Sequence, residues 1–331
     1  MDVTDLLARA VKAGASDVHL VASQAPLWRL DGELQRLEQE RLCDEALMRG
    51  LAPWLSDALR AQWLSGDEVD LAIDCAAFGR ARLSLFRQYH GLAASARLIA
   101  ADVPTVEALA LDDVYQEVSR CEGGLVLVGG ATGSGKSSTL AALIAQLARD
   151  RGGHTITLED PLEFLHRSGC GLITQREIGR HSQDFAQGLR SALRQDPDVI
   201  MIGELRDLDS IRLALRAAQT GHLVLATVHT RTAAGSIDRL VDVFAGEEKS
   251  LIRALLADCL QLVVAQALVR RVGGGRVAVR EVLVASPAVR NLIREGRVAQ
   301  LQSAMQAGAA QGMVTMEEAR RRLQAGGVVL G

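Results

Sequence analysis

The apolar and polar positions of the chain follow two different patterns, and the change falls near residue 100. In the first region, segments with helical spacing are mixed with short segments of strand alternation. Helical spacing occurs at residues 4–13 and roughly 43–64, and alternation at 18–21, 27–30, 69–73 and 80–86. A turn at Asp31 and Gly32 joins two alternating segments, as in a hairpin. The pattern predicts a small α+β domain over residues 1–100.

Residues 101–122, which include Pro104, are interpreted as a linker. Beyond Gly123, strongly apolar runs alternate with helical segments. The expected strands are 125–128, 154–158, 199–202 and 223–228, and the expected helices are 136–149, 183–195, 208–219 and 249–271. This alternation predicts an α/β core over residues 123–286 with a mostly parallel sheet. A helical region with turns at Gly308 and Gly312 is expected at 287–331.

Composition excludes several classes of function. The 331 residues are enough for two domains at roughly 100–200 residues each. With 37 Lys and Arg against 40 Asp and Glu, the net charge is −3, and aromatic residues make up 3%. Neither a basic field nor base-stacking platforms are indicated, so nucleic acid is not an expected partner. The isolated cysteines argue against a zinc ribbon and a secreted disulfide scaffold.

No segment reaches the ~18 consecutive apolar residues that a membrane span needs. The N-terminus carries Asp2 and Asp5 and lacks the basic and then apolar layout of a signal peptide. We therefore expect a cytoplasmic protein without direct membrane insertion, which reaches a membrane only through a partner.

A glycine-rich segment predicts a phosphate site. It fits the pattern G-x-x-x-x-G-K-[ST], with an apolar strand before it and a helix after it, as phosphate binding by backbone N–H groups requires. The candidate ATP-binding residues are Gly130, Ala131, Thr132, Gly133, Ser134, Gly135, Lys136, Ser137 and Ser138. Lys136 is expected to reach the β and γ phosphates as a compact charge. The Ser137 hydroxyl is expected to ligate Mg²⁺, and Ser138 to lie outside the metal shell.

Acidic residues after two further strands are candidates for the metal site and for the general base. Glu204 follows the strand at 199–202 and is expected to serve Mg²⁺ through water, because Gly203 stands where many such enzymes have Asp. The base must then lie elsewhere, and Glu163 is favoured because Pro161 imposes a turn that can present it. Glu159 or Asp160 would position Glu163 or contact the metal.

Two histidines bracket the strand at 223–228. His229 follows the carboxyl end of the strand, the edge at which ligands bind in parallel sheets, and could sense the γ-phosphate. His222 precedes the strand, and a supporting or interface role is as plausible as a structural one.

Four motifs in order resemble the nucleotide-site motifs of the secretion ATPase superfamily: GGATGSGKSST, ITLEDPLEF, RSALRQDPDVIMIGELRD and TGHLVLATVHT. Further segments resemble the PilT-like pilus retraction ATPases within it: DVHLVASQAPLWRLDGEL, IDRLVDVF and AVRNLIREG. The resemblance implies a PAS-like α+β domain followed by a RecA-like P-loop ATPase. It also implies a homohexamer that hydrolyses ATP between its domains and subunits to drive pilus disassembly and twitching motility.

The same resemblance implies partners and further residues. The partner would be an inner-membrane pilus platform protein, at the inner face of the cytoplasmic membrane, and a paralogous pilus ATPase is a second candidate. Arg82 and Arg97 match the family arginines that approach the γ-phosphate. The chain departs from the family at Ala131, at 181–185 and at the glycine loop 273–275.

Other functions remain alternatives. A pilus-assembly or type II secretion ATPase is one, although such proteins carry a long N-terminal extension and a tetracysteine zinc element that the sequence lacks. A weakly hydrolysing regulatory paralogue and a nucleic-acid translocase are the others.

Overall fold

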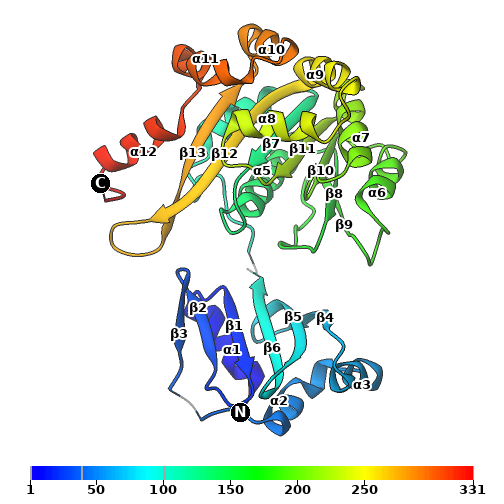
Figure 1. Ribbon diagram of the computed structural model, residues 1–331, viewed down its shortest axis with the longest axis vertical. Helices are drawn as coiled ribbons and strands as arrows, with labels where there is room; N and C mark the ends of the chain where they lie inside the picture. Colours follow the sequence, from blue (N-terminus) through cyan, green and yellow to red (C-terminus); the bar gives the residue numbers. More distant parts are fainter. Residues whose placement is uncertain (1, 39, 100–101, 331) are drawn as a thin grey trace. The chain divides into compact units, whose positions relative to one another are not determined.

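The computed structural model describes residues 2–38, 40–99 and 102–330. The chain divides into two compact units, Met1–Asp102 and Val103–Gly331, which we call unit 1 and unit 2 (Figure 1). None of the helices in these described ranges is long and apolar enough to cross a membrane.

Unit 1 is built on an antiparallel sheet with the strand order β3-β2-β1-β6-β5-β4. Its strands are β1 (Asp17–Val21), β2 (Leu27–Leu30), β3 (Glu33–Arg36), β4 (Val69–Cys75), β5 (Gly79–Gln88) and β6 (Gly91–Ile99). Its helices are α1 (Val3–Lys12), α2 (Asp44–Leu51), the 3-10 turn η1 (Ala52–Trp54) and α3 (Asp57–Ser65). Val18 and Leu20 of β1 join the core with Leu7 of α1, while the alternate residues of β1 lie on the opposite face.

Unit 2 contains a sheet with the strand order β13-β12-β7-β11-β10-β8-β9, in which only the β12–β13 pair is antiparallel. The strands are β7 (Gly124–Gly129), β8 (His154–Glu159), β9 (Leu172–Glu177), β10 (Val199–Ile202), β11 (Leu223–Val228), β12 (Leu260–Arg270) and β13 (Arg276–Val284). The helices are α4 (Asp112–Arg120), α5 (Lys136–Arg151), α6 (Phe185–Ala192), α7 (Leu208–Gln219), α8 (Ala233–Asp242) and α9 (Glu248–Cys259). The C-terminal region adds α10 (Pro287–Arg294), η2 (Val298–Gln300), α11 (Leu301–Ala307), η3 (Ala309–Gln311) and α12 (Met316–Ala325).

The sheet of unit 2 is covered on both faces, which explains its apolar strands. Alternate residues of β7 enter different cores: Leu127 packs with residues of α7, α8 and α9, and Val128 packs with residues of α4 and α5. A strand that is buried on both sides reads as a continuous apolar run. The expected α/β class, with a mostly parallel sheet and a helical C-terminal region, is confirmed.

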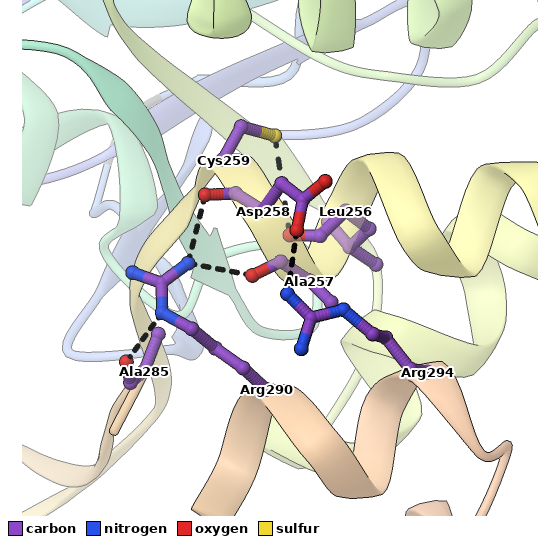
Figure 2. A network of polar contacts seen from close by, with 7 residues as sticks. All are labelled: Leu256, Ala257, Asp258, Cys259, Ala285, Arg290 and Arg294. Atoms are coloured by element: carbon purple, nitrogen blue, oxygen red, sulfur yellow. Dashed lines mark hydrogen bonds and ion pairs between the residues drawn. The ribbon is translucent and has the colours of Figure 1, made fainter. Parts of the chain in front are cut away.

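The helix predicted at 249–271 is wrong in its second half, because α9 ends at Cys259 and β12 follows at once. A short apolar run fits a buried strand as well as a helix, so periodicity could not separate the two. The end of α9 is fixed by α10: Arg290 donates to Ala257 O at 2.6 Å and to Asp258 O at 2.9 Å (Figure 2). Arg294 forms an ion pair with Asp258 at 2.6 Å (Figure 2). Cationic side chains at the last carbonyls stabilise a helix end.

The segment 101–122 also differs from its interpretation as a linker. Residues 112–120 form α4, and Leu111, Val114 and Val118 are buried in the core of unit 2. Most of this segment is therefore packed structure. Its short length and charged surface positions hid the buried face in the sequence.

Candidate functional site

The predicted site residues of unit 2 follow four parallel strands that are neighbours in the sheet. In the order β7-β11-β10-β8, Gly129 pairs with Val228, Ala226 with Ile202, and Ile202 with Leu158. The strands run in the same direction, so their carboxyl ends form one edge. The glycine-rich loop, His229, Glu204 and Glu163 all leave the sheet at this edge.

The glycine-rich loop connects β7 to α5, and its backbone requires glycine. A Cβ on Gly130 would clash with Ser134 Oγ and stand 2.7 Å from Gln266 O. Gly135 adopts φ 87° directly before α5, and no side chain caps this helix. The N–H groups of the first turn are therefore open to an anion, as at phosphate-binding helix N-termini.

Lys136, the first residue of α5, is buried against this loop, with 8% of its surface exposed. Its Nζ donates to Gly130 O at 2.9 Å and to Ala131 O at 3.0 Å. Burial lowers the pKa of Lys136, and the charges of Glu204 and Glu163 act in the opposite direction. Both carboxylates are therefore near enough to the ammonium group to affect its ionisation.

The remaining loop residues differ in access. Ala131, Thr132 and Gly133 are exposed, and Ser137 and Ser138 are half-buried. Ser134 is buried, and its hydroxyl has no hydrogen-bond partner among the described residues.

Gln266 on β12 holds this loop and was missed by the sequence analysis. It is 2% exposed, and its Nε2 donates to Ser134 O at 2.7 Å. Its Oε1 accepts a hydrogen bond from the Thr139 hydroxyl at 2.9 Å. One amide thus ties the loop to the first turns of α5. The signal in the sequence was a glutamine within an apolar run, because a buried amide must find polar partners.

Glu204 and His229 meet beyond β10 and β11. The Oε2 atom of Glu204 lies 3.2 Å from His229 Nε2 and accepts from Arg206 Nη2 at 2.6 Å. The pairing with Glu204 raises the pKa of Arg206. The structure also explains Gly203, because a Cβ there would be crowded at 3.1 Å from Leu158 O of the adjacent strand.

Glu159 organises the turn that carries Glu163. It is buried at the end of β8, where Thr157 Oγ1 donates to it at 2.6 Å and Gln175 Nε2 at 3.1 Å. The backbone N–H of Glu163 is a third donor, and burial raises the pKa of Glu159. Glu163 itself is exposed. Of the two roles left open for Glu159, these contacts favour positioning Glu163.

Asp160 and Pro161, joined by a cis peptide bond, precede Glu163. Asp160 is exposed. His222 lies at the other end of β11, where its carbonyl accepts from Gly124 N at 3.0 Å and its Nδ1 lies 3.1 Å from Ala217 O. It is therefore remote from the edge that carries the other candidates.

Arg82 and Arg97 belong to unit 1, where they lie directly opposite each other on β5 and β6. Each has an acidic neighbour: Arg82 Nη2 is 3.7 Å from Asp70 Oδ2, and Arg97 Nε is 3.2 Å from Asp17 Oδ1. Both guanidinium side chains are substantially exposed. Unit 1 thus brings the two arginines together on one face of its sheet.

In unit 2 a glycine-rich loop joins a strand to a helix that begins with a buried lysine, and acidic residues follow the neighbouring parallel strands. This combination defines the class of P-loop ATPases. Residues 1–329 match the family model of the type II/IV secretion system proteins. The chain belongs to this family.

The relatives extend along nearly the whole chain. The type IV pilus retraction ATPase PilT of Pseudomonas aeruginosa is 45% identical over 99% of this chain and 96% of its own length. A twitching motility protein of Neisseria gonorrhoeae is 41% identical over 93% of this chain and 83% of its own length. The crystal structure of the pilus retraction motor PilT with bound ADP superimposes with a TM-score of 0.88 at 38% identity, covering 99% of this chain and 94% of that one. The resemblance to this family and its ATPases is confirmed.

Proposed function

We propose that this chain is an ATP-hydrolysing motor that powers type IV pilus retraction and thereby twitching motility. The observation that carries the chemistry is the meeting of four elements at one sheet edge: the phosphate loop, Glu163, Glu204 and His229. The retraction role is supported by the similarity to proteins that are named for pilus retraction and twitching.

In this proposal, ATP is the substrate and binds at this edge of the sheet. The N–H groups of residues 130–138 surround its phosphates, and Lys136 neutralises the β and γ phosphates. Gln266 keeps the loop in its shape through Ser134 O. Lys136 already lies over the loop, held by two loop carbonyls, so little rearrangement is needed to receive a phosphate.

The donor set beside the loop fits Mg²⁺, which prefers oxygen ligands. The Ser137 hydroxyl would bind the ion directly and the Glu204 carboxylate would bind it through water. The ion, when bound, neutralises charge that develops on the phosphates. His229 keeps Glu204 oriented through their 3.2 Å contact and lies where it can sense the γ-phosphate.

Glu163 is the general base in this proposal. It is exposed at the edge and held on a turn that Glu159 fixes, so it can accept a proton from the attacking water. Arg82 and Arg97 supply positive charge to the transition state. In a homohexamer, these arginines would serve the ATP site of a neighbouring subunit. The proposed partners are an inner-membrane platform protein, at the inner face of the cytoplasmic membrane, and a paralogous pilus ATPase.

A deletion strain tests the direction of movement. It would be complemented with the wild-type gene, with Lys136→Ala or with no gene, and scored for surface pili and surface motility. Excess, static pili without Lys136 are expected, because pili would be assembled but not withdrawn. Absence of pili would indicate an assembly ATPase and contradict the proposal.

A further inference from the structure

The segment between β9 and α6, which includes residues 181–184, contributes no residue to the proposed ATP site. Together with the end of β9 and with α6 it lines an open cavity of about 540 Å³, in which Arg180, Arg190 and Arg194 are exposed to solvent. Ten residues line this cavity, and they include four arginines, one histidine and no acidic residue. The arginines are Arg176, Arg180, Arg190 and Arg194.

Most of this positive charge is not balanced by carboxylates. Within the described part of the chain, Arg190 pairs with Asp209 at 3.5 Å, and the other three arginines have no acidic partner. The Nη2 atom of Arg176 donates to His181 O at 3.2 Å, while its buried Nη1 has no hydrogen-bond partner among the described residues. A buried donor of this kind is costly unless a ligand or water satisfies it.

The neutral His181 ring at the cavity is also a hydrogen-bond donor. The Nδ1 atom of His181 accepts the backbone N–H of Glu177 at 3.0 Å, so the neutral ring carries its proton on Nε2. The nearby carboxylate of Asp184 is used as the N-cap of α6, where it accepts from Gln187 N at 2.7 Å. The cavity therefore offers hydrogen-bond donors and positive charge to an occupant.

We propose that this arginine-lined cavity binds a small soluble anion that carries one or more phosphate groups. Guanidinium groups match the oxygens of phosphate in pairs, and the volume lies in the range of small-molecule sites. The site shares no residue with the phosphate loop. Its existence is independent of the proposed function, because binding can be measured without ATP hydrolysis.

Calorimetric titration of the full chain with inorganic pyrophosphate tests the site. The Lys136→Ala background removes the cation of the phosphate loop, so that binding at the cavity dominates. Saturable binding is expected, and Arg180→Gln with Arg190→Gln should raise the Kd by about tenfold or more, since charged hydrogen bonds are lost. Arg216→Gln, an exposed change of the same charge on α7, should leave the Kd unchanged.

Arg180→Gln alone is a second variant, because its side chain has no partner in the described chain and its loss leaves the fold intact. Unchanged melting temperatures would show that the variants are folded. Absence of pyrophosphate binding, or binding that survives both arginine variants, overturns the proposal. Retention on phosphatidylglycerol vesicles that depends on these arginines, without pyrophosphate binding, also overturns it, because the occupant would then be a lipid surface.

Discussion

The two sheets of this protein carry their candidate functional residues in different ways. In unit 2, the candidate residues follow the carboxyl ends of parallel strands: Glu163, Glu204 and His229 lie on loops, and Lys136 begins α5 directly after the glycine-rich loop. In unit 1, the candidate arginines lie within antiparallel strands, opposite each other and beside acidic residues. The first arrangement gathers side chains from four strands at a single edge, whereas the second places them on a sheet face.

This difference determines which candidate residues can be recognised from the fold alone. A charged residue that follows a buried parallel strand lies at the edge where ligands bind in such sheets, so its position alone makes it a candidate. Arg82 and Arg97 have a structural explanation in their contacts with Asp70 and Asp17. Only the family resemblance nominates them for catalysis. The candidates of unit 2 therefore rest on their position in the fold, whereas the two arginines of unit 1 rest on similarity alone.

Lys136→Ala should have the largest effect on the candidate site of unit 2. The β and γ phosphates would lose their cation, so both nucleotide binding and hydrolysis should fall to background, a loss of about 10³-fold or more. The change would be measured as steady-state phosphate release and as binding of a fluorescent ATP analogue. Lys249→Ala is the matched control, because its ion pair with Asp242 is exposed to solvent and contributes little to stability. Equal rates for the two variants would refute the site.

Glu163→Gln should separate hydrolysis from binding. Loss of the general base should lower kcat by about 10³-fold, while the affinity for ATP stays near that of the wild type. Glu122→Gln is the control, since it removes the same charge from an exposed position before the amino end of β7, at the other edge of the sheet. A kcat within roughly threefold of the wild-type value would show that another residue is the general base.

The sequence was sufficient to predict those elements whose residue spacing follows from phosphate binding. The phosphate loop and the strands before Glu204 and His229 could be predicted, because a glycine-rich loop must join a strand to a helix and ligands gather at strand ends. The sequence was insufficient where contacts between residues far apart in the chain determine the secondary structure. The switch from α9 to β12 depends on Arg290 reaching back to Ala257 O and Asp258 O, which no local pattern reveals.

Arg82→Ala and Arg97→Ala test whether the face of unit 1 takes part in catalysis. The exposed pair of Arg82 with Asp70 should contribute about 1 kcal/mol or less to the free energy of unfolding, and the pair of Arg97 with the mostly buried Asp17 should contribute more. In both variants hydrolysis should fall by about 10²-fold. Mixing either variant with Lys136→Ala subunits should restore part of the activity if the arginines serve a neighbouring subunit. The mixed assembly would then contain sites with an intact lysine and intact arginines.

Urea unfolding and phosphate release would be measured on the same samples. A loss of stability without a loss of activity would assign the arginines to the fold of unit 1 alone. Activity that is lost in each variant and not restored by mixing would place them in their own subunit's site.

Gln266→Leu should have the smallest effect on hydrolysis. Gln266 is an exception to the difference between the two units, because it lies within a strand of unit 2 and yet supports the site. Leucine would leave Ser134 O and the Thr139 hydroxyl without their partner. The loop should then spend less time in its phosphate-binding shape, and the KM for ATP should rise by roughly tenfold. Thr139→Val removes only the second contact and should have a smaller effect. If Gln266→Leu lowers the melting temperature but leaves KM unchanged, this strand position serves the fold of unit 2, and only the residues that follow its strand ends serve catalysis.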